Sequence, residues 1–523
     1  MPFRGLLNLG VVVLCAAMAL HATTTPSKAA ARCSLVYNLK VDLPFNPPTG
    51  FNERVVEKSL KYGWKTFLAL AAEAPGQMVN LIGDNKTQWS TWSSSQALIR
   101  CARDQTNCTC TSRDCLKSRV EYYPEECQAI DGYENYRVLG QISKVDDSFL
   151  QATVGNLSNT PLIDMNGKFL RYEILVNPVA QDYVVKNKYY DKTVLDNLTE
   201  DLVFPCGDKS YTGGNPANKK AGSFIVKNAW MQVPKRKGLE YRRTYLRKFH
   251  TEELLVYTPS YRNKTGAATC EKRRMALVGQ HIANKTVTQP RWLWTTFEHK
   301  LTAPNCTDDV PPAGDQQGST PNLSCPATVT KDYLFYPQKC SADGSDPDAC
   351  QSCNAAPESN RKGCKNPSVD GDESWCLDKP PAKVAGTSRL CRQVNTKEYF
   401  VNPFNRACRK SLGAGSVWAR YEQIAMQWYN TKATKCVTRS NTDPDLTIPP
   451  VLMGSSGDFD LKPYLANTSM ESDIRSNCMG CHAKATVGDN SVSTDFMYWI
   501  QLEAAEDFSG TSGHPAAVSH NAE

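Results

Sequence analysis

The positions of apolar residues first predict a helix near the start of the chain. Between residues 52 and 75, apolar side chains recur at every third or fourth position, which is the spacing of a helix with one buried face. Asn52 stands where a helix N-cap is preferred, and Pro75 ends the pattern. We therefore expect a packed helix whose buried face carries Val56, Leu60, Trp64, Phe67 and Ala71.

From about residue 140 to residue 300 the pattern changes to alternation of apolar and polar residues, which favours β-strands. The alternating apolar positions are Leu170, Tyr172, Ile174 and Val176, followed by Phe224, Val226 and Trp230. Two further apolar runs, at 275–282 and 292–298, flank the segment NKTVTQP. They predict a hairpin with a longish loop.

Helical spacing returns toward the C-terminal end. Ser416 can cap a run in which the following residues face one way: Val417, Trp418, Tyr421, Ile424 and Trp428. Ser493 can cap a second run, with Phe496, Trp499, Ile500 and Glu503. Thr468 and Glu471 have the spacing of a capping box. We therefore predict a helical region over residues 411–506, followed by a disordered tail at 507–523.

Cysteines divide the rest of the chain. A turn-rich segment at 101–127 has cysteines at 101, 108, 110, 115 and 127, and it is interpreted as disulfide-stapled. Residues 301–410 hold nine cysteines among polar and turn-forming residues, which predicts a surface insertion held by disulfides. The expected fold is α+β: residues 32–300 form a mixed region of helix and strands that is β-rich in its centre, and further helices follow the insertion.

The N-terminal 31 residues have the features of a secretory signal peptide. Arg4 precedes an apolar run from Gly5 to Leu20, and small residues offer a cleavage site at 29–31. No later stretch approaches the roughly 20 apolar residues that span a membrane. Of 21 cysteines, 18 remain after Cys15 and the two in CMGCH are set aside, an even number that allows up to nine disulfides. We expect a periplasmic or secreted protein without a membrane span after signal removal.

The net charge of +7 is modest for 523 residues, but basic residues gather between Lys235 and Arg274. Such a basic face could dock an acidic redox partner, although a solvated strand face without a partner is the alternative. The sequence contains no basic motif with interleaved aromatic residues, so nucleic-acid binding is not expected. The sequence does not define an oligomeric state.

The most specific chemical signal is CMGCH at residues 478–482. In a Cys-x-x-Cys-His motif the two thiols add to the vinyl groups of a porphyrin, while the imidazole reaches the iron. Cys478 and Cys481 are therefore predicted to attach one haem c, and His482 to ligate its iron. An ordinary disulfide or a zinc site are the alternatives, but zinc sites usually show a second paired cluster.

The segment CQSC at residues 350–353 is the nearest second cluster, and it is followed by Asn354 where a second haem would need histidine. One haem is therefore expected. Only 41 residues follow His482, and Met497 is the single methionine among them. A self-contained small cytochrome c domain supplies its methionine from a longer segment, so the haem is expected to be covered by the large upstream region.

The candidates for the other face of the iron are the two histidines of the predicted hairpin. His281 or His299 could ligate the iron or transfer protons beside an open iron, and a hydrogen-bonded core histidine is the alternative. Trp292 and Trp294 could pack near the porphyrin or relay charge, although core packing is the commoner use. Met470 is a weaker ligand candidate.

Symmetric pairing of the hairpin about its loop would place His281 opposite Trp292 and His299 opposite Arg274. The two histidines would then lie about 23 Å apart along the strands, at about 3.3 Å per residue. They could not both bind the same iron.

Several segments together resemble large exported bacterial proteins, called cytochrome c family proteins, that have one C-terminal haem motif. The matching stretches are WKTFLAL from Trp64, GKFLRYEILVN from Gly167, LVGQHIANKTVTQPRWLWTTFEH from Leu277, SVWARYEQIAMQW from Ser416, LANTSMES from Leu465 and NCMGCHA from Asn477. The resemblance implies haem binding and electron transfer at Cys478, Cys481 and His482, with His281 and His299 in a recurrent hairpin motif. It implies no particular substrate.

Three functions follow as expectations. The first is a periplasmic monohaem electron carrier, whose ligands and burial set the reduction potential. The second is a haem c enzyme that acts on peroxide, dioxygen or a small organic substrate, with a histidine as acid or base. The third is a haem-based sensor or binding protein.

Overall fold

The computed structural model describes the parts of the chain that build a central sheet and its two covering layers. The described residues are 53–73, 86–103, 106–110, 115–140, 162–207, 221–234, 245–260, 263, 265–287, 289–306, 326, 329–336, 363–365, 373–375, 390–392, 401–428, 436, 467–470, 482, 485–488 and 492–504. The predicted signal peptide, the tail at 507–523, Cys478, Cys481 and much of the predicted insertion lie outside them.

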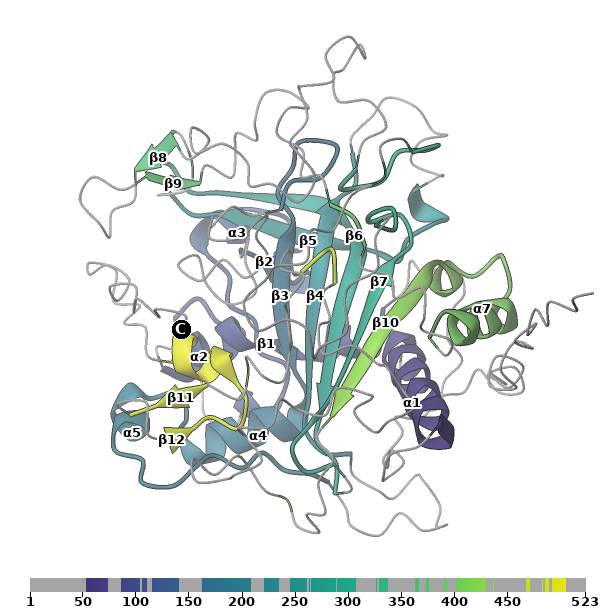
Figure 1. Cartoon of the computed structure of the whole chain (residues 1–523). Helices are drawn as coiled ribbons and strands as arrows, with labels where there is room; N and C mark the ends of the chain where they lie inside the picture. The colour runs from purple at the N-terminus through teal and green to yellow at the C-terminus, as the bar shows by residue number, and fades with distance from the viewer. Residues whose placement is uncertain are drawn as a thin grey trace, which may run out of the picture.

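An eight-stranded sheet forms the centre (Figure 1). Its strands are β1 (Ser93–Ser94), β2 (Val138–Leu139), β3 (Arg171–Val176), β4 (Phe224–Gln232), β5 (Thr251–Thr258), β6 (Thr269–Asn284), β7 (Leu293–His299) and β10 (Tyr421–Trp428). The long strand β6 pairs along one edge with β4, and along its other edge first with β5 and then with β7. β10 extends the sheet beyond β7, and only the β2–β5 pair is parallel among these strands.

Helices and short strands surround this sheet. The helices are α1 (Glu53–Ala71), α2 (Ser95–Arg103), α3 (Glu125–Gln128), α4 (Pro178–Asn187), α5 (Lys192–Asp196), α7 (Val401–Leu412) and α9 (Tyr498–Glu503). Short 3₁₀ turns lie at Gln88–Thr91, Cys115–Lys117, Tyr133–Asn135 and Val417–Arg420. Two small ribbons are formed by β8 (Gly363–Lys365) with β9 (Glu373–Trp375), and by β11 (Thr486–Val487) with β12 (Val492–Ser493).

The sheet separates two apolar layers. On one face, here the α1 face, Phe297 of β7 packs against Trp64 and Phe67 of α1, with ring centroids 5.1 and 4.1 Å apart. On the other face, here the His482 face, Trp294 of β7 contacts His482, and the turn at 467–470 is hydrogen-bonded to Glu298. Figure 1 shows α1 and α7 at one side of the sheet and the C-terminal elements β11 and β12 at the other. The fold is therefore mixed α+β and strand-rich, as predicted.

Two of the predicted elements are confirmed with their physical basis. The helical spacing after Asn52 forms α1, whose apolar face buries Leu60, Trp64 and Phe67 completely. The hairpin predicted around NKTVTQP is the antiparallel β6–β7 pair. In both places the periodicity and the tertiary environment agree, since each apolar stripe faces a layer of the core.

The prediction of a helix over 416–428 is wrong. Only Val417–Arg420 forms a 3₁₀ turn, and Tyr421–Trp428 is the strand β10, antiparallel to β7. A register shift between Gln423 and Ala425 explains the misleading pattern, because it changes the alternation of Tyr421, Met426 and Trp428 within the strand. The open edge of β7 supplies backbone partners that the local sequence does not reveal.

The predicted boundary at residue 410 falls inside α7. This helix lies largely within the expected surface insertion, yet Val401, Phe404 and Cys408 belong to the apolar core that also contains α1. Its buried positions do have helical spacing, but this short pattern directly follows a long cysteine-rich, turn-forming stretch, which dominated the prediction. The second predicted C-terminal helix exists in shorter form as α9, with Ser493 in the strand β12.

Disulfides join distant parts of the described chain. The segment at 101–127 contains the bridges Cys101–Cys108 and Cys110–Cys115, in agreement with the predicted stapling. Longer links are Cys127–Cys270, Cys206–Cys436 and Cys306–Cys391. Such bridges are compatible with an extracellular or periplasmic protein. None of the described helices is long and apolar enough to cross a membrane.

Candidate functional site

His482 lies buried between the central hairpin and the C-terminal helix. Its side chain is 7% exposed, and its ring centroid lies 4.3 Å from that of Trp294 on β7 and 5.3 Å from that of Tyr498 on α9. The imidazole Nδ1 is 2.8 Å from the backbone oxygen of Phe496. Two segments far apart in the chain, β7 and residues 496–498, therefore fix the position of this ring.

The hydrogen bond to Phe496 defines the tautomer of His482. A backbone carbonyl oxygen can only accept, so Nδ1 must carry the proton and donate it. The lone pair is then on Nε2, which is the nitrogen that a metal would bind. This is the arrangement that holds metal-ligating histidines in proteins, because the bond to Nδ1 both orients the ring and raises its basicity.

The surroundings of His482 are aromatic and contain unsatisfied donors. Trp292, Trp294 and Trp499 belong to one buried cluster, and the indole Nε1 of each has no hydrogen-bond partner among the described residues. Buried donors of this kind are normally satisfied. An apolar region that also offers N–H donors fits a large flat group carrying acceptor atoms at its edge.

His281 lies on the same face of the sheet as His482. Its cross-strand partners are Lys227 on β4 and Thr296 on β7, and cross-strand partners share a face. Thr296 is two residues from Trp294, so His281 and Trp294 are diagonal neighbours at about 7–8 Å between their backbones. The His281 side chain is 5% exposed. The structure thus places one of the two predicted distal histidines beside the aromatic contact of His482.

His299 points to the opposite face, and both of its ring nitrogens are engaged. Nε2 is 2.9 Å from the carbonyl oxygen of Lys248, and Nδ1 accepts the backbone N–H of Leu301 at 3.1 Å. The ring stacks on Phe249 and meets the edge of Tyr421. Burial lowers the pKa of His299 to about 3. It is a neutral core histidine, which argues against the predicted role in iron ligation.

The predicted hairpin register is wrong by four residues. His281 pairs with Thr296 instead of Trp292, so only three residues separate the two histidines along β7, or about 10 Å. The reason is that the turn is not symmetric about the loop: Asn284 already pairs with Leu293. His281 and His299 still cannot share a metal, because they occupy opposite faces.

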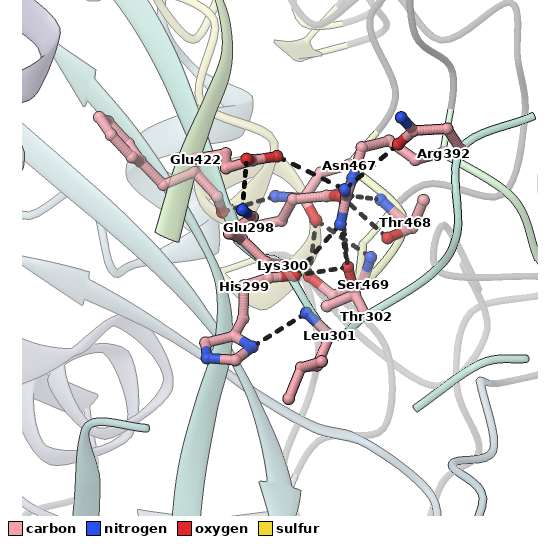
Figure 2. Close-up of polar contacts among 12 residues, drawn as sticks. Glu298, His299, Lys300, Leu301, Thr302, Arg392, Glu422, Asn467, Thr468 and Ser469 are labelled. Atoms are coloured by element: carbon pink, nitrogen blue, oxygen red, sulfur yellow. Dashed lines mark hydrogen bonds and ion pairs between the residues drawn. The ribbon is translucent and has the colours of Figure 1, made fainter. Parts of the chain in front are cut away.

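The turn at residues 467–470 is clamped onto β7 by a buried carboxylate (Figure 2). Oε2 of Glu298 accepts the backbone N–H of Thr468 at 2.8 Å and its hydroxyl at 3.0 Å. Oε1 accepts hydrogen bonds from Nε of Arg392 and from the hydroxyl of Thr302. Asn467 donates from Nδ2 to the hydroxyl of Thr296 and the carbonyl of Phe297, each at 2.8 Å.

Sequence reasoning missed this clamp, in which Thr468 takes part. Its hydroxyl bonds to Glu298, while the capping-box partner Glu471 lies outside the described residues. The available signal was Glu298 itself, an acidic residue within an apolar strand. Because Arg392 is 94 residues away in the chain, its pairing with Glu298 could not be read from local spacing.

The two methionines considered at the sequence level both lie in apolar clusters. Met470 is fully buried with residues such as Leu162, Tyr172 and Phe335, in a cluster separate from the tryptophans near His482. Met497 follows Phe496 and shares the tryptophan cluster.

The basic run is partly neutralised where it is described. Arg274 pairs with Glu253 across β5 and β6, and Arg273 pairs with Glu271. Residues 235–244 lie outside the described part of the chain. In the described residues, no three His, Cys, Asp or Glu side chains are grouped so that they could hold a metal ion.

Comparisons with known proteins give no relative for this chain. No protein-family model matches it, and neither the curated proteins nor the solved structures contain a significant match.

Proposed function

We propose that this chain is an exported monohaem c-type cytochrome that transfers electrons. The observation that carries the proposal is the buried position of His482, the histidine of CMGCH, whose Nδ1 donates a hydrogen bond to the Phe496 carbonyl. The motif alone predicts a ligand, and a hydrogen bond from Nδ1 to a backbone carbonyl supports ligation through Nε2.

The residues around His482 fit a haem by their chemistry. Cys478 and Cys481 would form its thioether links and His482 its proximal ligand, while the unpaired indole N–H groups of Trp292, Trp294 and Trp499 could meet its polar edge. The haem would supply a one-electron couple between ferric and ferrous iron. The protein's own part is to orient His482, to exclude water with buried aromatic side chains and so to set the potential.

The position of Trp294 supports the expectation that the upstream region covers the haem. This residue comes from the central hairpin, 188 residues before His482 in the chain, yet their rings are in contact. A small autonomous cytochrome c domain would not need this hairpin. The predicted export to the periplasm agrees with the disulfides and with haem attachment outside the cytoplasm.

The first prediction tests covalent haem attachment. The purified protein should show the absorption bands of a c-type cytochrome and a pyridine haemochrome of one haem per chain. Cys478→Ser with Cys481→Ser should lose all haem that resists denaturation, because both thioether links are removed. Cys110→Ser with Cys115→Ser removes a disulfide pair instead and serves as the matched control. Wild-type protein that contains zinc or no cofactor would refute the proposal.

A second candidate function, a haem-dependent oxidoreductase, is favoured by one observation. His281 lies beside Lys227 on the His482 face, so that a group able to act as acid or base and a cation are neighbours there. Iron ligation by His281 would instead give the saturated carrier. The two functions therefore differ in what His281 does.

The second prediction separates the roles of the two hairpin histidines. If His281 ligates the iron, as we expect for a carrier, His281→Ala should convert a low-spin ferric spectrum to high spin and allow rapid carbon monoxide binding to the ferrous form. His299→Gln should leave the spin state unchanged, since this ring faces the other side of the sheet. A wild-type protein that is already high spin and binds carbon monoxide would favour the enzyme.

A further inference from the structure

A buried ion pair lies directly behind the segment that holds His482. Lys285, in the connection after β6, places its Nζ on Oδ2 of Asp495, and both side chains are fully buried. The same carboxylate oxygen accepts the backbone N–H of Phe204 at 2.8 Å. Isolated buried charges are strongly disfavoured, so the two residues depend on each other.

Asp495 belongs to a backbone segment that needs outside support. Asp495 and Phe496 have φ values of 53° and 70°, so two consecutive residues with side chains adopt left-handed conformations. Such conformations persist only where neighbouring contacts over-determine them. The carbonyl of Phe496, which accepts the proton-bearing Nδ1 of His482, is part of this segment.

Lys285 is itself fixed by the sheet. Its backbone N–H donates to the carbonyl of Ser223 at 3.0 Å, and its ammonium lies 5.8 Å from the ring centroid of Trp292. Gly222 permits this approach, because a Cβ there would lie 2.1 Å from the carbonyl oxygen of Lys285. A rigid cation therefore faces the carboxylate that holds the strained segment.

We propose that Lys285 and Asp495 are a positioning pair that aims the Phe496 carbonyl at His482 and thereby tunes the reduction potential of the haem. This inference rests on the proposed function. A well-aligned acceptor raises the basicity of a ligating imidazole and favours ferric iron. When the pair is lost, the carbonyl turns away from Nδ1 and the imidazole becomes a weaker electron donor to the iron. The ferrous state is then stabilised relative to the ferric state.

The test compares three variants by redox titration. The variant carrying both Lys285→Met and Asp495→Asn keeps the net charge of the site and removes both ions together, which proteins often tolerate. It should favour reduction by about tenfold relative to wild type, equivalent to about 59 mV for one electron. Asp495→Asn alone should shift the potential in the same direction and further, because an unpaired cation also favours ferrous iron.

The third variant, Glu173→Gln, is the matched structural control. It breaks another buried ion pair, with Arg137 on the α1 face, at 3.0 Å. It should lower thermal stability and leave the potential unchanged. Because a general loss of stability would act equally in both places, a shift confined to the Lys285 and Asp495 variants identifies a positioning role.

The outcomes distinguish the two proposals. Wild-type protein without covalent haem would overturn the proposed function. If haem is attached and the double variant has the wild-type potential, the positioning role is overturned while the function stands. If the double variant has the wild-type potential and Asp495→Asn alone shifts it, the carboxylate acts only through its charge, which also refutes positioning.

Discussion

Replacing Glu298 by glutamine should lower the free energy of unfolding by about 3–5 kcal/mol, the usual cost of breaking one side of a buried ion pair. The Glu298 side chain has no exposed surface, and it meets the guanidinium of Arg392, which is 9% exposed. Glutamine keeps the shape but presents an N–H₂ group to donors. The native carboxylate accepts hydrogen bonds from the backbone N–H of Thr468, from its hydroxyl and from Nε of Arg392. At least one of these donors then loses its acceptor.

Urea denaturation followed by tryptophan fluorescence measures this loss, and hydrogen exchange locates it. The backbone amide of Thr468 should exchange faster in Glu298→Gln, because its acceptor at 2.8 Å is altered. Glu422→Gln is the matched control: Glu422 also contacts Arg392, but its carboxylate is 14% exposed and has no described bond to residues 467–470. A Glu298 variant with wild-type stability and unchanged exchange at Thr468 would show that the clamp is not needed.

This clamp matters for function because of where the turn lies. The turn at 467–470 ends eight positions before Cys478, and its hydrogen bonds tie it to Thr296, Phe297 and Glu298 on β7. The same strand carries Trp294, which contacts His482. One strand thus fixes the segment before CMGCH at one point and the histidine of CMGCH at another. The chain is therefore bound to the sheet on both sides of Cys478 and Cys481.

The sequence predicted those elements whose local pattern agrees with their surroundings. The α1 helix has one apolar stripe and a single core to cover, so its 3.6-residue spacing was sufficient. The strand β10 was not predicted, because a bulge disturbs its period of two and its strand conformation depends on the open edge of β7. Pairing partners far away in the sequence leave no trace in a local pattern.

The same distinction applies to the candidate site. His482 was predicted from a contiguous motif, since its chemistry requires two cysteines at fixed spacing. The choice between His281 and His299 was not, because it depends on register, and an odd separation places two side chains on opposite faces. Lys285 and Asp495 were missed for a further reason. They lie 210 residues apart and became partners only through the folded sheet.

His299 should make the protein sensitive to acid. Burial is the main cause that lowers its pKa to about 3, and the cations of Arg420, Arg392 and Lys248 add to it. At pH values between about 3 and the ordinary histidine pKa of about 6.5, His299 binds a proton in the unfolded chain but not in the native protein. Stability therefore falls with decreasing pH across this window, by about 1.4 kcal/mol for each pH unit well below 6.5.

A comparison of wild type with His299→Gln isolates this contribution. Asp164 acts in the opposite direction, since burial raises its pKa to about 6 and its native carboxyl keeps a proton that the unfolded chain releases. Both proteins contain Asp164, so its effect cancels in the difference. Urea denaturation at pH 7 and pH 4.5 should show wild type losing about 2–3 kcal/mol more than the variant between the two values. Equal losses would mean that His299 takes up a proton in the native state as it does in the unfolded chain, and then Nδ1 does not accept the backbone N–H of Leu301.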